Sequence, residues 1–181
     1  MKEVNSYATY NMLPNLSYNI ISELVTNTKT NIIWKLLKYN TADAWNQADL
    51  TQEEKSSLIY NGGLNPEKYN VFMDFMLDSS VTDEKTFLRI YPSYIYPENR
   101  TVGLCSINFE IFSHSKINHL SNYTTRVDDI LQALIETLNG VNINTVGVLF
   151  FDNERDSSDK VTIIGNKPYK GKLLTMSVNI G

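Results

Sequence analysis

The acidic stretch at residues 152–160 is the part of the sequence that comes closest to a metal site. Asp152, Glu154 and Asp156 occupy the first, third and fifth positions of a calcium-binding loop, where carboxylate oxygens act as ligands. The sixth position is a serine where such loops need glycine, and the twelfth, Ile163, stands where they need glutamate. We therefore expect a solvated loop and no metal ion.

The other candidates for chemistry are two histidines and three potential nucleophiles. His114 and His119 are five residues apart in a polar segment, and this spacing in a loop fixes no geometry between them. The nucleophile would have to be Ser113, Ser115 or Cys105. Cys105 lies on the apolar face of a predicted strand whose other face is polar, and this position favours a buried, inert thiol. We predict no enzyme, catalytic residue or cofactor, and a hydrolase that uses either histidine is the alternative.

The best candidate for a protein interface is the tyrosine-rich segment 91-YPSYIYP-97. Tyr91, Tyr94 and Tyr96 stand among prolines, which stiffen an extended chain. Tyrosines are enriched at the centres of protein interfaces, so these three are predicted to contact a partner. The alternative is an edge connection whose rings pack on their own sheet.

Composition limits the classes of function. The chain has 181 residues, 42% of them hydrophobic, which is enough for a sizeable core. Its 16 basic and 20 acidic residues give a net charge of −4, which argues against tight wrapping of DNA. One cysteine and two histidines exclude an intrachain disulfide and a closed Cys/His zinc site. The sequence has neither an apolar run of about 18 residues nor a signal-peptide pattern, so we expect no membrane contact.

The first half of the chain has the periodicity of helices. Apolar residues recur at helical spacing in two stretches between residues 16 and 39. Thr51 and Glu54 match a capping box, which predicts a third helix that ends at the glycines of residues 61–63. Residues 71–77 are expected to form a short helix or strand before a polar linker. A helical N-terminal arm is therefore predicted over residues 1–82.

The second half changes to the two-residue period of strands. Residues 104–112 alternate apolar and polar side chains, which predicts a strand with one buried face. Residues 127–138 form one apolar stripe, which predicts an amphipathic helix closed by the Asn-Gly pair that follows it. Residues 145–151 are apolar on both faces, which predicts a central strand. Further strands are expected at residues 87–91, stopped by Pro92, and at residues 161–164 and 172–180.

These elements predict the fold class α+β. A mostly antiparallel sheet of four to five strands carries one amphipathic helix packed on it, and a helical N-terminal arm precedes it. The expected division is an arm at residues 1–82 and a core domain at residues 83–181.

This order of elements resembles the tail terminator proteins of tailed bacteriophages. The resemblance rests on residues 104–114, 126–138, 145–151 and 170–180, and it covers about residues 86–181. It implies a non-enzymatic structural protein of the virion, of which six copies close a ring that terminates the tail and joins it to the neck. The helical arm departs from the compact family form, so a head-closure or head–tail adaptor protein, or another assembly adaptor, is the alternative.

The resemblance also implies partners and a location. The partners are further copies of the chain, neighbouring neck, portal-side and tail-tube proteins, and genome DNA that passes through the ring without specific binding. The protein is then located in the neck or tail of the virion after assembly in the host cytoplasm. Residues 16–60 are expected to dock on an adjacent subunit. The loop residues expected to face the lumen or a partner are Asp152, Glu154, Arg155, Asp156 and Asp159.

Overall fold

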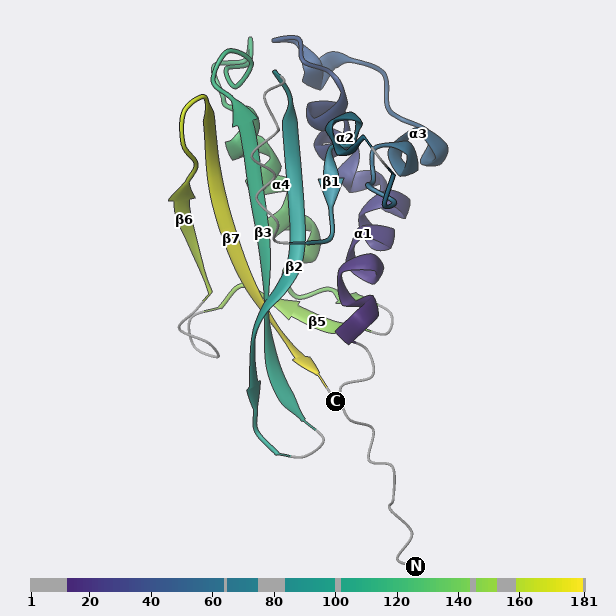
Figure 1. The fold of residues 1–181 in the computed structure, drawn as a ribbon, viewed down its shortest axis with the longest axis vertical. Helices are drawn as coiled ribbons and strands as arrows, with labels where there is room; N and C mark the ends of the chain where they lie inside the picture. The colour runs from purple at the N-terminus through teal and green to yellow at the C-terminus, as the bar shows by residue number, and fades with distance from the viewer. Residues whose placement is uncertain are drawn as a thin grey trace, which may run out of the picture.

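The computed structural model describes residues 13–63, 65–74, 84–99, 102–143, 146–152 and 159–180. Within them the chain forms an α+β fold with one curled sheet (Figure 1). The helices are α1 (Leu16–Thr26), α2 (Asn31–Lys38), α3 (Gln52–Ser57) and α4 (Arg126–Leu138). The strands are β1 (Val71–Phe72), β2 (Thr86–Pro97), β3 (Gly103–His114), β4 (Asn142–Ile143), β5 (Gly147–Phe150), β6 (Lys160–Ile164) and β7 (Tyr169–Ile180).

The sheet has more strands than the four to five predicted from the sequence. Six of its seven strands follow the order β1-β2-β3-β7-β5-β4, and the seventh, β6, also pairs with β7. Every described pair is antiparallel except β1 with β2, so the sheet is mixed but mainly antiparallel. The central strand is β7 and not β5, because β7 pairs with β3 along its whole length. The prediction of a central strand at residues 145–151 was therefore wrong.

Strand β2 continues through Pro92, where the sequence predicted its end. Strand β1 reaches β2 only at Leu88 and Arg89, so no described strand covers the outer edge of β2 beyond them. A proline lacks the backbone N–H of a ladder, and this loss is tolerated at an uncovered edge. The ladder with β3 also shifts between Pro92 and Ile95, where a bulge places two residues opposite one.

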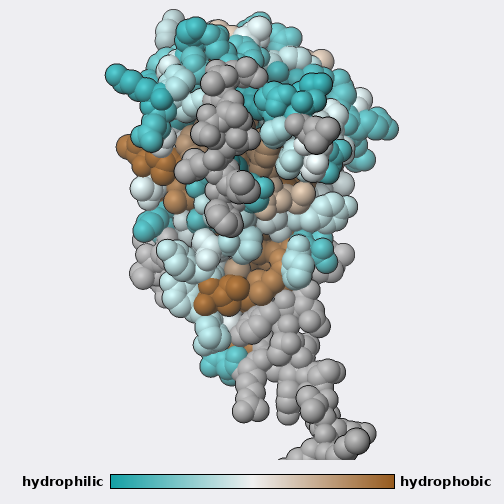
Figure 2. All heavy atoms as spheres, viewed as in Figure 1, coloured by the Kyte–Doolittle hydropathy of each residue, from teal (hydrophilic) through white to brown (hydrophobic). Residues whose placement is uncertain are grey.

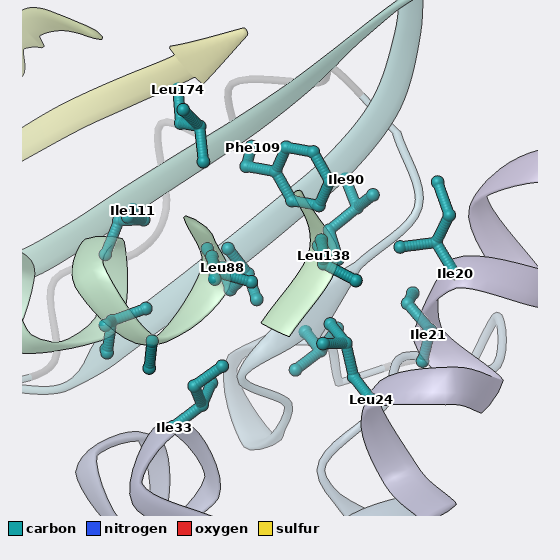
Figure 3. Close-up of a cluster of buried hydrophobic side chains, with 14 of the residues drawn as sticks. Ile20, Ile21, Leu24, Ile33, Leu88, Ile90, Phe109, Ile111, Leu138 and Leu174 are labelled. Carbon is teal, nitrogen blue, oxygen red and sulfur yellow. The ribbon is translucent and has the colours of Figure 1, made fainter. Parts of the chain in front are cut away.

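Helices α1, α2 and α4 all cover the same face of the sheet. Their buried side chains form one hydrophobic cluster with residues of β2, β3 and β7, including Leu24, Ile33, Phe109, Leu138 and Leu174 (Figure 3). Helices α1 and α2 are thus part of the core, and they are not an appendage that precedes a separate core domain. The expectation of a separate helical arm needs correction for this reason, whereas docking of residues 16–60 on an adjacent subunit stays a prediction for the surface of these helices that the core does not bury. More than one helix packs on the sheet.

The helix ends follow the local sequence signals at the start of α3 and at the end of α4. The Thr51 hydroxyl accepts a hydrogen bond from the Glu54 N–H, and the Glu54 carboxylate accepts one from the Thr51 N–H, which confirms the capping box. Helix α3 nevertheless ends at Ser57, well before the glycines that were expected to close it. Helix α4 ends as predicted, and Gly140 follows it with a φ of +75°.

The opposite face of the sheet carries a second, aromatic cluster. Phe72, Phe87 and Phe112 form its buried part, and the rings of Phe87 and Phe112 stack with centroids 4.9 Å apart. The guanidinium of Arg89 lies 5.4 Å from the Phe87 centroid, and its Nη1 is 3.5 Å from Glu110 Oε2. This face is therefore closed near the top of the sheet by rings and one buried ion pair.

Candidate interaction surfaces

The end of the β2–β3 hairpin extends beyond the rest of the sheet and carries exposed apolar side chains (Figure 1). Tyr94 is 63% exposed and Tyr96 is 49% exposed, and their ring centroids are 6.3 Å apart. Ile95 and Val102 are also exposed on this hairpin. We call these four residues the hairpin surface. It is the most exposed apolar group that the sequence analysis singled out.

The strand register explains why these side chains point outward. Ile95 pairs with Cys105 and Tyr96 pairs with Leu104, so the two-residue alternation resumes after the bulge. Cross-strand partners share a face, so Ile95 lies on the helix-bearing side of the sheet and Tyr96 on the other side. At the tip, the Asn99 side chain accepts a hydrogen bond of 2.9 Å from the Val102 N–H. The hairpin is thus internally ordered on both sides of residues 100–101.

Tyr91 does not belong to this surface, although the sequence grouped it with Tyr94 and Tyr96. Its ring is half-buried, and its hydroxyl donates a hydrogen bond of 2.7 Å to Glu110 Oε1. Burial, followed by this contact with a carboxylate, raises the pKa of Tyr91 to about 12. Tyr91 therefore supports the base of the hairpin, and two of the three predicted tyrosines are available to a partner.

The acidic loop is only partly described. Glu154, Arg155 and Asp156 lie outside the described residues, whereas Asp152 and Asp159 lie inside them. Asp159 is 3% exposed, and its carboxylate accepts hydrogen bonds from the Ser177 hydroxyl (2.6 Å) and from the Asp152 N–H (2.9 Å). Asp159 thus ties the loop to β7. It does not present its carboxylate to the surface, and that is a correction to its expected role.

The candidate catalytic residues lie in different environments. Cys105 is fully buried in the core, and burial raises the pKa of its thiol to about 11. The hydroxyl of Ser113 pairs with that of Thr86 at 3.1 Å. His114 is buried on the other face, where its ring packs edge-on against Tyr169. Ser113 and His114 are adjacent on one strand, so their side chains point to opposite faces. The described residues contain no group of three or more potential metal ligands.

The pockets on the described surface include two that lie beside candidate contact elements. The first, of about 390 Å³, lies between α1, the end of α3 and the residue that follows β1, and we call it the α1–α3 groove. Its lining is mainly apolar and includes Tyr18, Ile21, Val25, Ile59, Tyr60 and Met73. The second, of about 370 Å³, lies between the start of α4 and the β6–β7 hairpin, and we call it the β6 groove. Its lining includes His119, Val127, Asp128, Ile163, Tyr169 and Lys172.

The sequence analysis missed the buried cations of the described residues, and two of them, Arg126 and Lys55, connect helices. Arg126 is fully buried and donates hydrogen bonds to the carbonyl oxygens of Ile117 (2.6 Å), Leu36 (3.0 Å) and Thr41 (2.5 Å). Burial lowers the pKa of Arg126 to about 10, so the guanidinium keeps its charge at pH 7. This side chain joins the start of α4 to the end of α2. The sequence signal that could have revealed this role is a basic residue at the start of a helix, where the helix dipole disfavours a positive charge.

The second buried cation is Lys55 of α3. Its Nζ donates to Asn31 Oδ1 (2.7 Å) and to the carbonyl oxygen of Val25 (3.1 Å), and burial lowers its pKa. The contact joins α3 to the end of α1 and the start of α2. Both buried cations thus fix the helices to one another, and neither points toward a ligand site.

A comparison with protein families gives a match over most of the chain. A family model named YomW matches residues 31–178, which run from α2 to near the end of β7. The chain belongs to the YomW family. The YomW name is of the kind given to genes related to Bacillus phages, which indicates a phage protein. The YomW match includes α2 together with the sheet, as expected if they form one unit. No curated protein matches the chain in a sequence search.

The longest described helix of this YomW protein, α4, has 13 residues. None of the helices in the described ranges is long and apolar enough to cross a membrane.

Proposed function

We propose that this chain is a structural virion protein of a tailed bacteriophage. In this proposal six copies form a ring at the head–tail interface, which terminates the tail and joins it to the neck. The membership in a phage-related family supports a phage role. The order of β2, β3, α4 and the strands after α4 supports the resemblance to tail terminator proteins.

The observation that carries the proposal is that one subunit has two different apolar surfaces. A closed ring uses a head-to-tail contact, in which one surface of each copy meets a different surface of the next. The hairpin surface projects from the sheet, and the α1–α3 groove is hollowed between helices. A projecting surface and a groove suit such a contact, and in the proposal the hairpin of one copy occupies the groove of its neighbour.

The proposal extends to the other partners. The net charge of −4 supports a lumen through which DNA passes without specific binding, because acidic groups repel phosphate. Within the acidic loop, Asp152, Glu154, Arg155 and Asp156 stay candidates for the lumen or for a neighbouring neck, portal-side or tail-tube protein. The location that follows is the neck or tail of the virion.

The mass of the purified protein and the symmetry of its particles test the ring. Six copies of the 20.7-kDa chain have a mass of about 124 kDa, so light scattering should give this value or a whole multiple of it. Negative-stain averages should show rings with six-fold symmetry. The double variant Tyr94→Ser/Tyr96→Ser should lose the ring, whereas Tyr91→Phe, at the hairpin base, should keep it. Particles without six-fold symmetry would overturn the ring.

A head-closure or head–tail adaptor protein is the second candidate. It is favoured by the position of α1 and α2 in the core, because the resemblance to tail terminators covers only about residues 86–181. An adaptor of this kind predicts a chain that assembles only on its partner. Purified protein that stays monomeric but binds isolated heads or tails would favour this candidate over the ring.

A further inference from the structure

Strand β6 leaves one edge of the sheet open. Among the described residues it pairs only with β7, from Lys160 opposite Thr175 to Ile164 opposite Gly171. Figure 1 shows β6 at the outer edge of the sheet, beside β7. An edge strand presents a row of backbone N–H and C=O groups without strand partners, and this row can accept another strand.

The other edges of the described sheet are protected. The outer edge of β2 carries Pro92, Pro97 and the bulge, and each of these interrupts strand pairing. Strands β1 and β4 are each two residues long, which is too short to hold an added strand. Strand β6 has five residues, no proline and no recorded bulge, and Lys160 is its one charged residue. This edge is therefore the one best suited to strand addition.

Two apolar side chains of β6 are exposed to solvent, as its backbone edge is. Ile163 is 84% exposed and Val161 is 39% exposed, and Figure 2 shows hydrophobic surface along β6. Val161 pairs with Leu174 of the core and Ile163 pairs with Lys172, so both point toward the side that α4 covers. Ile163 also lines the β6 groove beside Val127. An unfilled apolar groove thus adjoins an open strand edge.

We propose that β6 pairs antiparallel with β6 of a second copy of this chain, so that the two sheets become continuous across a two-fold axis at Thr162. In this register Val161 lies opposite Ile163 of the second copy, and Ile163 lies opposite Val161 of the second copy. Four β-branched side chains then form one apolar cluster over the two grooves, and such cross-strand pairs stabilise sheets. Lys160 lies opposite Ile164 of the second copy, so the two lysines lie at opposite ends of the contact.

The sequence of β6 favours a second copy over a foreign segment, because the exposed side chains of Val161 and Ile163 lie opposite each other when the strand pairs with itself. The contact goes beyond the proposed ring, since ring closure needs only head-to-tail contacts. It predicts that two rings associate through β6, or two chains where no ring forms. The number of copies in the assembly is therefore twice the number that the head-to-tail contact alone would give.

Light scattering on a matched set of variants tests the pairing. Ile163→Lys places a charge at an exposed position of the edge, so folding should be kept and the assembly mass should fall to half that of the wild type. Ile95→Lys makes the same chemical change on the hairpin surface, and it tests the head-to-tail contact of the ring and not the β6 contact. Its loss of the ring should leave a dimer of about 41 kDa, and the double variant should be a monomer of 20.7 kDa.

These outcomes separate the two contacts. Equal masses for wild type and Ile163→Lys would overturn the β6 pairing, whatever happens to the ring. A mass that halves in Ile163→Lys but is unchanged in Ile95→Lys would support β6 pairing and count against the role of the hairpin.

A disulfide tests the register. Thr162→Cys should cross-link two copies under mild oxidation, because directly opposite residues bring their Cβ atoms to about 4.5–5.5 Å, close to disulfide range. Thr28→Cys, at an exposed site away from β6, is the control. The native Cys105 is buried and should not react. Cross-linking of Thr162→Cys no faster than that of the control would overturn the Thr162-centred register.

Discussion

Replacing Arg126 by methionine tests how strongly one buried cation holds the helices together. The substitution keeps an unbranched side chain but removes three hydrogen bonds to the carbonyl oxygens of Ile117, Leu36 and Thr41. A hydrogen bond from a charged donor contributes about 1.5–3 kcal/mol, and a buried acceptor left without a donor costs about 1–3 kcal/mol. Relief from burying the charge offsets part of this loss.

The expected net loss of unfolding free energy is about 3–5 kcal/mol, because backbone carbonyls cannot be replaced by apolar groups as a paired carboxylate can. A domain of this size has a total stability of roughly 5–15 kcal/mol, so the change should be obvious. Urea unfolding, followed by the fluorescence of the buried Trp34, measures it. The melting temperature should fall by roughly 10 °C.

Lys172→Met is the matched control, because it also replaces a cation by methionine. Lys172 pairs with Asp128, but both side chains are partly exposed to solvent, so the expected loss is below about 1 kcal/mol. If Arg126→Met is no more destabilising than this control, then the three carbonyl contacts do not stabilise the packing of α4 against α2. Arg126→Lys should fall between the two, because an ammonium group lacks the planar fork that reaches three acceptors.

Two further predictions concern the sheet. A Cβ at Gly171 would lie 2.7 Å from the Ile111 carbonyl oxygen and 2.8 Å from the Phe112 ring. Gly171→Ala should therefore lower the unfolding free energy by about 1–3 kcal/mol, measured by urea unfolding. An unchanged urea midpoint would show that β3 and β7 move apart enough to accept the methyl group without cost. Tyr91 keeps its proton up to about pH 12, whereas an unfolded chain releases it near pH 10. Stability from Tyr91 is therefore present below pH 10 and is lost as the pH rises toward 12, and Tyr91→Phe should flatten this loss in denaturation at several pH values. Absorbance at 295 nm should also lose its highest-pH tyrosine step in Tyr91→Phe, and a titration identical to wild type would contradict the assignment.

Strong local signals predicted the elements that are in fact present. The alternation in β3, the apolar stripe of α4 and the capping box of α3 each depend on residues close together in the chain, and the structure confirms all three. The position of the elements in the fold was harder to predict. The apolar stripes of α1 and α2 indicated that one face is buried, but not that it is buried against the same sheet as α4.

The errors have the same physical origin. Within residues 145–151, the side chains of Val146 and Leu149 are buried in the core and the residues beside Leu149 are half-buried. A strand near the edge of the sheet, with only short pairings, produces the same apolar pattern as a central strand. The sequence grouped Tyr91 with Tyr94 and Tyr96 because all three lie in one proline-containing segment, whereas the burial of Tyr91 depends on Glu110, on the next strand. Arg126 bonds to residues 85 and 90 positions away, and no local pattern records such a contact.

The central position of β7 has a consequence for the timing of folding on the ribosome. Strand β7 follows every other strand in the chain, yet it links β3 to β5 and β6 in the sheet. Until it leaves the ribosome, β3 lacks one neighbour, and the apolar residues of β3 and α4 lack part of their cover. Pairings between distant segments form late because the chain must first close long loops. A nascent chain therefore cannot complete its core early, and β6, which has no other described neighbour, gains its place in the sheet only when translation has passed β7.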